Sequence, residues 1–289
     1  MTTAIQQRGT VDAIDFQGLP ALALTGPQGA QAIVALHGAH VLSWIPAAST
    51  EKLYLSDKAD VSGAGPIRGG VPVCFPQFSG HGPLPKHGLV RTLTWQSLEQ
   101  HASEDVTSVV LGTDDSAVNH ALWPHPFRLR LHVALAATTL TITLHAHNTG
   151  DAPFTFTTAL HTYLAVADIA TAYLDGLGGV GYRDAANGNR AATQATPRLT
   201  FAGEIDRVYH AAPGLLLGRD GVAAMSIQAA GFADTVVWNP GPELCARLAD
   251  MPVDGHRHML CVEAACADSP VTLGPGQSWE GSQRLTALL

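Results

Sequence analysis

The chain has few charged side chains. They make up 14% of its 289 residues, and the formal net charge is −8. Without a basic face, a protein gains little counterion-release or surface-potential energy from nucleic acid or from an anionic membrane. No stretch approaches the roughly 18 uncharged apolar residues of a membrane span, and the first residues, MTTAIQQRGT, lack the apolar core of a signal peptide. We therefore expect a cytoplasmic protein with no nucleic-acid and no membrane partner. Its oligomeric state stays open, with a monomer favoured.

Cysteine is also scarce. The thiols form no C-x-x-C pair and do not indicate a disulfide framework, so we expect four reduced, buried cysteines: Cys74, Cys245, Cys261 and Cys266. Two histidine pairs have a spacing that would place both members on one face of a strand: His145/His147 and His256/His258. This spacing permits a metal, but the chain has neither an H-E-x-x-H motif nor a Cys/His quartet. We therefore expect no metal and no cofactor.

Acidic residues are missing from one long stretch. None of the 38 residues between Asp60 and Glu99 is Asp or Glu, although Arg68, Lys86 and Arg91 all lie there. Arginine presents a fixed fork that binds phosphate through two hydrogen bonds, and the glycines after Arg68 would let backbone amides approach an oxyanion. The structural alternative is a crossover rich in proline and glycine. Spacing alone does not decide whether Arg68 and Arg91 meet.

Alternation of apolar and polar residues is abundant. Apolar side chains occupy every second position in residues 127–136 (FRLRLHVALA) and 140–146, as is typical of half-buried β-strands. Together with residues 153–166 (PFTFTTALHTYLAV), these runs predict a three-stranded meander. Similar runs predict further strands at 31–38, 40–46, 105–112, 198–205, 222–229 and 258–265. Short helices are expected only within 114–122 and 242–248.

The chain shows no internal division. It contains no linker, low-complexity tract or fixed-period repeat, and 46% of its residues are hydrophobic, enough for a large core. We therefore predict an all-β fold, a single large antiparallel β-sandwich domain over residues 1–289.

Three titratable residues are candidates for chemistry. Glu263 is the one carboxylate in the apolar run MLCVEAAC, and a buried glutamate is rare without a function or a partner. An internal salt bridge to a distant arginine is its structural alternative. His161 ends an alternating strand among apolar neighbours, where burial would disturb its pKa. His87 lies in a loop with proline and glycine, a setting where a lone histidine is more often a surface hydrogen-bonding group.

Five segments carry a known pattern in a consistent order. They are residues 67–91 (IRGGVPVCFPQFSGHGPLPKHGLVR), 159–166 (ALHTYLAV), 204–209 (EIDRVY), 236–240 (VVWNP) and 259–265 (MLCVEAA). This set resembles the glucose-6-phosphate 1-epimerases, also called D-hexose-6-phosphate mutarotases, a branch of the aldose 1-epimerase superfamily. The resemblance implies a galactose mutarotase-like β-supersandwich.

The resemblance also implies a role for seven residues. The catalytic positions fall on three of them: Glu263, His161 and His87. The substrate-binding positions fall on the other four: Arg68 and Arg91 for phosphate, Gln77 for a hydroxyl group and Asp206 for the sugar.

Two positions depart from the family pattern. Relatives continue after VVWNP with an aromatic residue and soon a lysine, whereas this chain has Gly241 followed by PELCARL. After CVEAA the expected amide is replaced by Cys266. These departures leave the catalytic set intact, whereas their effect on the pocket rim, and hence on the preferred sugar, stays open.

The candidate catalytic residues suit the opening of a cyclic hemiacetal. Glu263 suits the base that takes the proton from O1, and His161 the acid that protonates ring oxygen O5, with His87 hydrogen-bonded to the same oxygen. We therefore predict an isomerase that interconverts the α and β anomers of hexose 6-phosphates, glucose 6-phosphate first among these small-molecule sugar phosphates. The alternatives are an aldose 1-epimerase acting on unphosphorylated sugars and a non-catalytic carbohydrate-binding β-sandwich.

Overall fold

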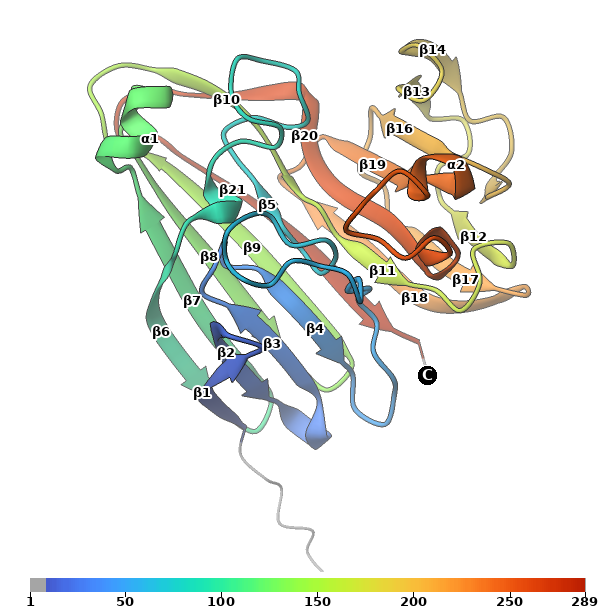
Figure 1. Cartoon of the computed structure of the whole chain (residues 1–289), viewed down its shortest axis with the longest axis horizontal. Helices are drawn as coiled ribbons and strands as arrows, with labels where there is room; N and C mark the ends of the chain where they lie inside the picture. Colours follow the sequence, from blue (N-terminus) through green and yellow to red (C-terminus); the bar gives the residue numbers. More distant parts are fainter. Residues whose placement is uncertain (1–8, 289) are drawn as a thin grey trace, which may run out of the picture.

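The computed structural model describes residues 9–288, whose strands pair antiparallel in three sheets (Figure 1). The smallest sheet is a meander of four strands: β1 (Thr10–Phe16), β2 (Leu19–Thr25), β3 (Gln31–Ala35) and β4 (Val41–Ile45). The nine-stranded sheet has the order β15-β12-β17-β18-β21-β9-β8-β7-β6. Its strands are β6 (Gln96–Ala102), β7 (Thr107–Asp114), β8 (Phe127–Leu135), β9 (Thr139–Asn148), β12 (Ala172–Asp175), β15 (Arg198–Thr200), β17 (Leu215–Arg219), β18 (Val222–Ala230) and β21 (Ser278–Ala287).

The eight-stranded sheet carries the pocket described below. Its order is β14-β13-β16-β19-β20-β10-β5, and β11 also pairs with β20. Its strands are β5 (Val73–Cys74), β10 (Phe154–Leu160), β11 (Tyr163–Ala165), β13 (Gly181–Asp184), β14 (Arg190–Thr193), β16 (Ile205–Tyr209), β19 (Asp234–Asn239) and β20 (Met259–Leu273).

Helix is limited, within residues 9–288, to short segments. They are α1 (Ala117–Leu122), α2 (Gly241–Cys245) and three 3₁₀ helices at Pro27–Gly29, Val90–Thr92 and Gly255–His258. Both α-helices lie where the sequence predicts helix. None of the helices in this range is long and apolar enough to cross a bilayer. The antiparallel strands confirm the all-β prediction.

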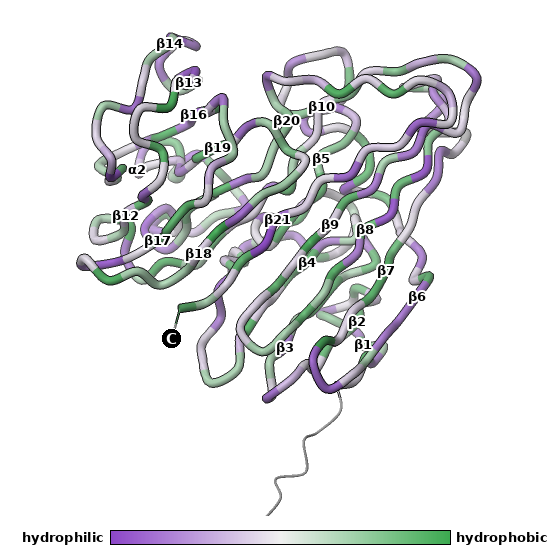
Figure 2. Tube along the Cα trace, turned by 180° about the vertical axis from the view of Figure 1, so that it is seen from behind, coloured by the Kyte–Doolittle hydropathy of each residue, from purple (hydrophilic) through white to green (hydrophobic). Residues whose placement is uncertain are grey.

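The alternating sequence pattern matches the burial of the strands. In β8, the predicted inward residues Phe127, Leu129, Leu131, Val133 and Leu135 are at most 1% exposed. Burial of each such side chain stabilises the fold by roughly 1.5–3 kcal/mol. The edge strand β6 differs, because its residues are exposed or half-buried and it is largely purple in Figure 2. A polar edge strand protects an open sheet from pairing with other chains.

The predicted three-stranded meander is wrong in its third strand. β8 and β9 pair as expected, but β10 lies in the eight-stranded sheet between β20 and β5. The free edge of β9 is occupied by β21 instead. The side-chain amide of Asn148 donates to the carbonyls of Ala152 and Leu273, which ties the connection to the end of β20. Phe154 then pairs with Leu273, so the chain enters the other sheet.

One cluster of buried side chains joins all three sheets. It includes Trp44 of the small sheet, Leu131 of the nine-stranded sheet and Leu260 of the eight-stranded sheet. The large sheets pack through these apolar faces, which leaves the central strands β16, β19, β20 and β10 to support a polar pocket. The single-domain prediction for residues 1–289 stays a prediction, because residues 1–8 and 289 lie outside the described range.

Candidate active site

The base of the pocket is the face of β20 that carries Glu263. This side chain is only 1% exposed, and its backbone pairs with Val236 of β19. Because strand residues alternate between faces, Cys261 emerges on the same face two residues earlier, beside Trp238 of β19 and Tyr163 of β11. Neighbouring strands thus hold the carboxylate in a rigid setting. The structural alternative for Glu263, a salt bridge to a distant arginine, is not present among the described residues.

His161 lies beside Glu263. It follows directly after β10, and its backbone N–H donates to the carbonyl of Pro72. Its Nδ1 lies 3.4 Å from Oε1 of Glu263, within ion-pair distance. The contact lacks hydrogen-bond geometry, and neither Nδ1 of His161 nor Oε2 of Glu263 has a hydrogen-bond partner. The imidazole stacks on Tyr163 with ring centroids 4.9 Å apart and planes inclined by 10°.

His87 completes the group, with a tautomer that its neighbours determine. Nδ1 of His87 accepts the backbone N–H of Ser79 at 3.3 Å and lies 3.3 Å from Sγ of Cys74. A backbone N–H can only donate, so the proton of the neutral ring must be on Nε2. The ring centroids of His87 and His161 are 5.1 Å apart. His87 is thus a hydrogen-bond donor through Nε2. Its backbone has a φ of 66°, which is unusual for a residue other than glycine.

Burial shifts the pKa of each of these groups towards the uncharged form. It raises the pKa of Glu263 well above its ordinary value, and the nearby Asp206 raises it further. Burial lowers the pKa of His161 well below its ordinary value, and the positive charges of Arg68 and Arg91 act in the same direction. Burial, with Arg91 and Lys86, also lowers the pKa of His87 to about 3. A carboxylate with a raised pKa is a strong base, and an imidazolium with a lowered pKa is a strong acid.

Arg68 enters the same pocket from a loop that the sequence had singled out. Its Nε and Nη2 both lie 3.0 Å from Oδ2 of Asp250, and its Nη1 donates to the hydroxyl of Tyr163 at 3.1 Å. Gly69 and Gly70, which follow Arg68, allow this backbone to lie close to that of Tyr54. A Cβ at Gly69 would lie 2.4 Å from the carbonyl oxygen of Tyr54, and the N–H of Gly70 donates to that oxygen. Gly70 therefore does not offer its amide to an oxyanion.

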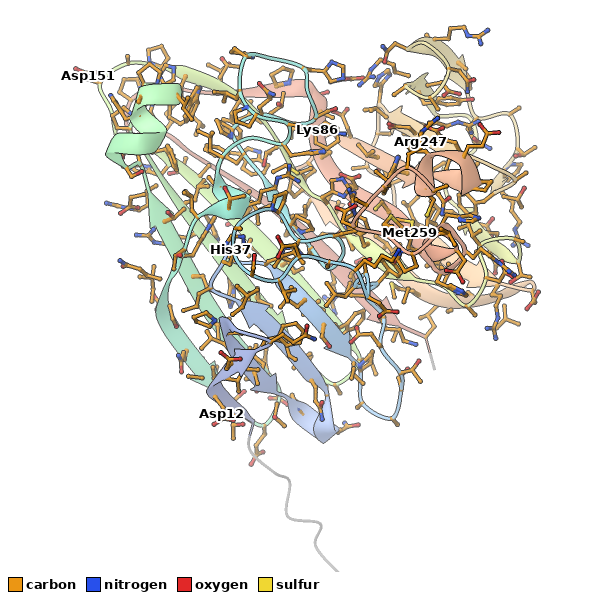
Figure 3. The ribbon with its side chains drawn as sticks, in the orientation of Figure 1. Asp12, His37, Lys86, Asp151, Arg247 and Met259 are labelled. Carbon is orange, nitrogen blue, oxygen red and sulfur yellow. The ribbon has the colours of Figure 1, made fainter. Side chains whose placement is uncertain are left out.

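Arg91 and Lys86 supply the other positive charges. Arg91 lies in the 3₁₀ helix Val90–Thr92, and its Nη2 donates to the backbone carbonyl of Lys86 at 2.7 Å. Lys86 is exposed on the loop between β5 and this helix (Figure 3). Together with Arg68 they line a pocket of about 270 Å³ that also contains the acid/base group. A pocket of this size fits one small polar ligand.

The structure brings six of the seven predicted site residues together. These six line the pocket: Arg68, His87, Arg91, His161, Asp206 and Glu263. Gln77 is not placed with them, because it holds the loop that follows. Its side-chain NH₂ donates to the carbonyls of Ser79 and Leu84, and its Oε1 accepts the N–H of Leu84. The prediction of Gln77 as a hydroxyl ligand is therefore not supported by its position.

Several pocket residues were not assigned from the sequence. Tyr163 and Trp238 lie inside the family-like segments ALHTYLAV and VVWNP, where an aromatic residue could have been read as a sugar-stacking platform. Lys86 was counted as a cation without a role. Asp250 carries no sequence signal, because it meets Arg68 across 182 residues.

The two departures from the family pattern lie outside the pocket lining. Gly241 is buried at φ 60°, and a Cβ there would lie 2.5 Å from the backbone nitrogen of Glu204, so this backbone excludes a larger residue. Its effect on the rim is indirect, through Leu244 and Leu248, which line the pocket after it. Cys266 is buried on β20, with Sγ directed to the carbonyl of Gly231 at 4.0 Å. Cys266 therefore does not line the pocket.

The predicted histidine pairs do not form metal sites in the described residues. His145 contacts Glu280, and His147 contacts the hydroxyl of Ser278. His256 and His258 lie in a 3₁₀ helix rather than in a strand, so the expected shared face is absent. Within residues 9–288, the one group whose atoms could hold a metal is His161, Cys261 and Glu263. All four cysteines are buried and unpaired, as predicted.

Comparison with known proteins places the chain. The model of the aldose 1-epimerase family matches residues 20–286. The chain is 34% identical over 281 residues to a protein of Cenchrus ciliaris, covering 94% of this chain and 85% of that one. It is 37% identical over 245 residues to a protein of Escherichia coli strain K12, covering 82% and 80%. Both relatives are named as candidate glucose-6-phosphate 1-epimerases.

A solved structure agrees with these relatives. The crystal structure of a candidate mutarotase from Salmonella typhimurium matches with a TM-score of 0.87 and 29% sequence identity, and covers 96% of this chain and 93% of that one. This likeness confirms the predicted mutarotase-like fold. The chain belongs to the aldose 1-epimerase family.

Proposed function

We propose that this protein interconverts the α and β anomers of hexose 6-phosphates, and that glucose 6-phosphate is the first substrate to test. One observation carries the proposal: a buried acid/base group shares one pocket with three cations, Arg68, Arg91 and Lys86. The group could act on a hemiacetal, and the cations could hold a phosphate. The names of the relatives in Cenchrus ciliaris and Escherichia coli point to the same substrate.

The protein contributes only proton transfers to this reaction, in which the C1–O5 bond breaks and forms again. The reactive state has Glu263 as the carboxylate and His161 as the imidazolium, which the shifted pKa values make a strong base and a strong acid. Glu263 takes the proton of the anomeric hydroxyl O1, and the O–H electron pair forms the C1=O1 double bond. The C1–O5 bond breaks, its electron pair goes to O5, and His161 supplies a proton to O5. Rotation about C1–C2 then exposes the other face of the aldehyde. On reclosure O5 returns its proton to His161 and O1 recovers the proton from Glu263, so both residues regain their initial states.

His87 stabilises this exchange as a donor. Its Nε2–H can hydrogen-bond to O5 while charge develops there, and its low pKa keeps the ring neutral. Asp206 lies in the same pocket and can accept a hydrogen bond from a sugar hydroxyl. Each well-placed proton transfer contributes roughly 10²- to 10⁴-fold, so the pair accounts for a large acceleration.

A second candidate function is anomerisation of an unphosphorylated aldose. The contact between Arg68 and Asp250 favours it, because the carboxylate already balances the charge of this arginine. The apolar rim residues Leu244 and Leu248 also suit a neutral ligand.

One experiment separates the two candidates. Exchange NMR or polarimetry should follow the anomerisation of α-glucose 6-phosphate and of free α-glucose, side by side. We expect a much higher kcat/KM for the phosphorylated sugar. A preference for free glucose would favour the second candidate, and no acceleration of either sugar would overturn both.

A further inference from the structure

One buried thiol beside the pocket has no part in the proposed reaction. Cys261 is 0% exposed and lies on the same face of β20 as Glu263. One ligand atom from each of Cys261, His161 and Glu263 lies within 4.8 Å of the others, and all three residues are buried. The backbone of β20 fixes two of these positions, and the end of β10 fixes the third.

Two polar atoms of this cluster have no hydrogen-bond partner. Nδ1 of His161 and Oε2 of Glu263 are buried without a hydrogen bond, although the two side chains are only 10% and 1% exposed. Buried polar atoms without partners are rare, since each loses its hydration without compensation. The cluster therefore has atoms available to coordinate a bound ion that the protein itself does not contain.

We propose that His161, Cys261 and Glu263 form a binding site for a zinc-class divalent cation, and that the bound ion inhibits the enzyme. A thiolate, an imidazole and a carboxylate are the usual protein ligands of Zn²⁺, at about 2.0–2.3 Å. Mg²⁺ and Ca²⁺ require oxygen ligands instead, so the site discriminates against them.

The geometry needs only a small adjustment. In a tetrahedral site with these bond lengths the ligand atoms lie roughly 3.5 Å apart. Nδ1 of His161 and Oε1 of Glu263 are already 3.4 Å apart, and one ligand atom from each of the three residues lies within 4.8 Å of the others. Three protein ligands leave a fourth position open, and His161 and Glu263 both line the pocket, so this position faces it.

Binding of the ion and inhibition are separate consequences. An ion held by Glu263 and His161 occupies the base and the acid, and it excludes the sugar from the base of the pocket. The inhibitory part of the proposal rests on the proposed function, whereas binding of the metal does not. The test therefore includes a spectroscopic measurement that requires no catalysis.

Co²⁺ is the spectroscopic probe. Titration of the purified protein with Co²⁺ should produce a near-ultraviolet thiolate-to-cobalt charge-transfer band, which Cys261→Ala abolishes. Cys261→Ser serves as the milder variant if the alanine variant does not fold, because its hydroxyl cannot give this band. The matched control is Cys266→Ala, which removes another buried thiol of β20 that lies outside the cluster and should leave the band unchanged.

Inhibition is measured in the same proteins. Zn²⁺ should slow anomerisation of glucose 6-phosphate in competition with the sugar, EDTA should restore the rate, and Mg²⁺ should have no effect. Relative to each variant's own uninhibited rate, Cys261→Ala should need about 100-fold more Zn²⁺ or still more, since even outer-shell losses weaken metal sites 10- to 100-fold. A band that persists in Cys261→Ala, or the absence of any band, would overturn the site. A normal band in a protein that anomerises no sugar would leave the metal site standing and reject the proposed function.

Discussion

Arg68 and Asp250 form a two-point contact inside the pocket, with Nε and Nη2 of the arginine both 3.0 Å from one carboxylate oxygen. The third nitrogen of Arg68 donates to Tyr163. Arg91 differs, because its guanidinium donates to a backbone carbonyl and has no carboxylate partner in the described part of the chain. The two arginines therefore offer unequal charge to an incoming phosphate, with the uncompensated charge on Arg91.

Removal of Arg91 should lower kcat/KM for the phosphorylated substrate and leave kcat/KM for free glucose nearly unchanged. We expect Arg91→Ala to lower kcat/KM for glucose 6-phosphate roughly 10- to 150-fold. This corresponds to the loss of about 1.5–3 kcal/mol of interaction free energy, because hydrogen bonds to a charged group are lost. Arg68→Ala should cost at least as much, since it leaves Asp250 unpaired beside the phosphate. Free glucose should be nearly unaffected in both variants. Steady-state kinetics with the two sugars provide the measurement, and equal losses on both sugars would make the arginines structural.

The carboxylate of Asp250 should weaken binding of the phosphate, because it competes for Arg68. In Asp250→Asn the charge of Arg68 is no longer balanced, so the KM for glucose 6-phosphate should fall about two- to fivefold, a modest change because Asp250 is partly exposed. The KM for free glucose is the internal control and should not fall. The double variant Arg68→Ala/Asp250→Asn should bind the phosphate better than Arg68→Ala alone. A rise in KM for the phosphorylated sugar would show that Asp250 positions Arg68 instead of competing for it.

Glu263→Gln should separate catalysis from binding. The amide keeps the shape of the side chain and removes the base, so anomerisation should fall by about 10²- to 10⁴-fold. The affinity for glucose 6-phosphate, measured by calorimetry, should stay within a few-fold of wild type, because the cations are unchanged. Near wild-type anomerisation in this variant would reject Glu263 as the base.

His161 and His87 should respond differently to substitution. His161→Ala should lower kcat by about 100-fold or more if His161 is the acid. His87→Gln, which preserves an N–H donor but cannot transfer a proton, should be milder, because Ser79 already restricts His87 to a donor role. The comparison of kcat in the two variants is the measurement. A loss below tenfold in His161→Ala, with a large loss in His87→Gln, would move the acid role to His87.

The sequence predicted the strands of this fold better than their arrangement. Alternation identified β8 and β9, because one face of each is buried and the other is polar. It did not predict that β10 belongs to the eight-stranded sheet, since this depends on the Asn148 contact with Leu273, 125 residues away. Periodicity describes the environment of a strand, and long-range contacts choose its neighbour.

The same distinction applies to the pocket. His161 and Glu263 were identifiable because a polar group in an apolar run is conspicuous, and the resemblance to a known family added Asp206. Asp250 was not identifiable, since its function depends only on its distance from Arg68 in space. The role of Gln77 could not be assigned from the sequence, because an amide can serve a loop or a ligand equally well, and its contacts with Ser79 and Leu84 become visible only in the structure.

The loop that holds Arg68 depends on a buried neutral histidine. Nε2 of His40 donates to the carbonyl of Gly69 at 2.7 Å, and His40 is only 1% exposed. Burial lowers the pKa of His40 from 6.5 to about 4, against a smaller opposing effect of this hydrogen bond. The unfolded chain therefore takes up a proton at a higher pH than the folded protein does.

This difference predicts a loss of stability in acid. The contribution of His40 is fully present above the unfolded pKa of 6.5, falls as the pH drops from 6.5 to about 4, and does not change further below that value. The total change is on the order of 3 kcal/mol for a shift of this size. Urea unfolding of wild type and His40→Gln at several pH values between 7.5 and 4 measures it, and an exposed histidine replaced in the same way controls for general effects. We expect the stability advantage of wild type to shrink across this window, and an advantage that stays constant with pH would show that His40 does not titrate as proposed.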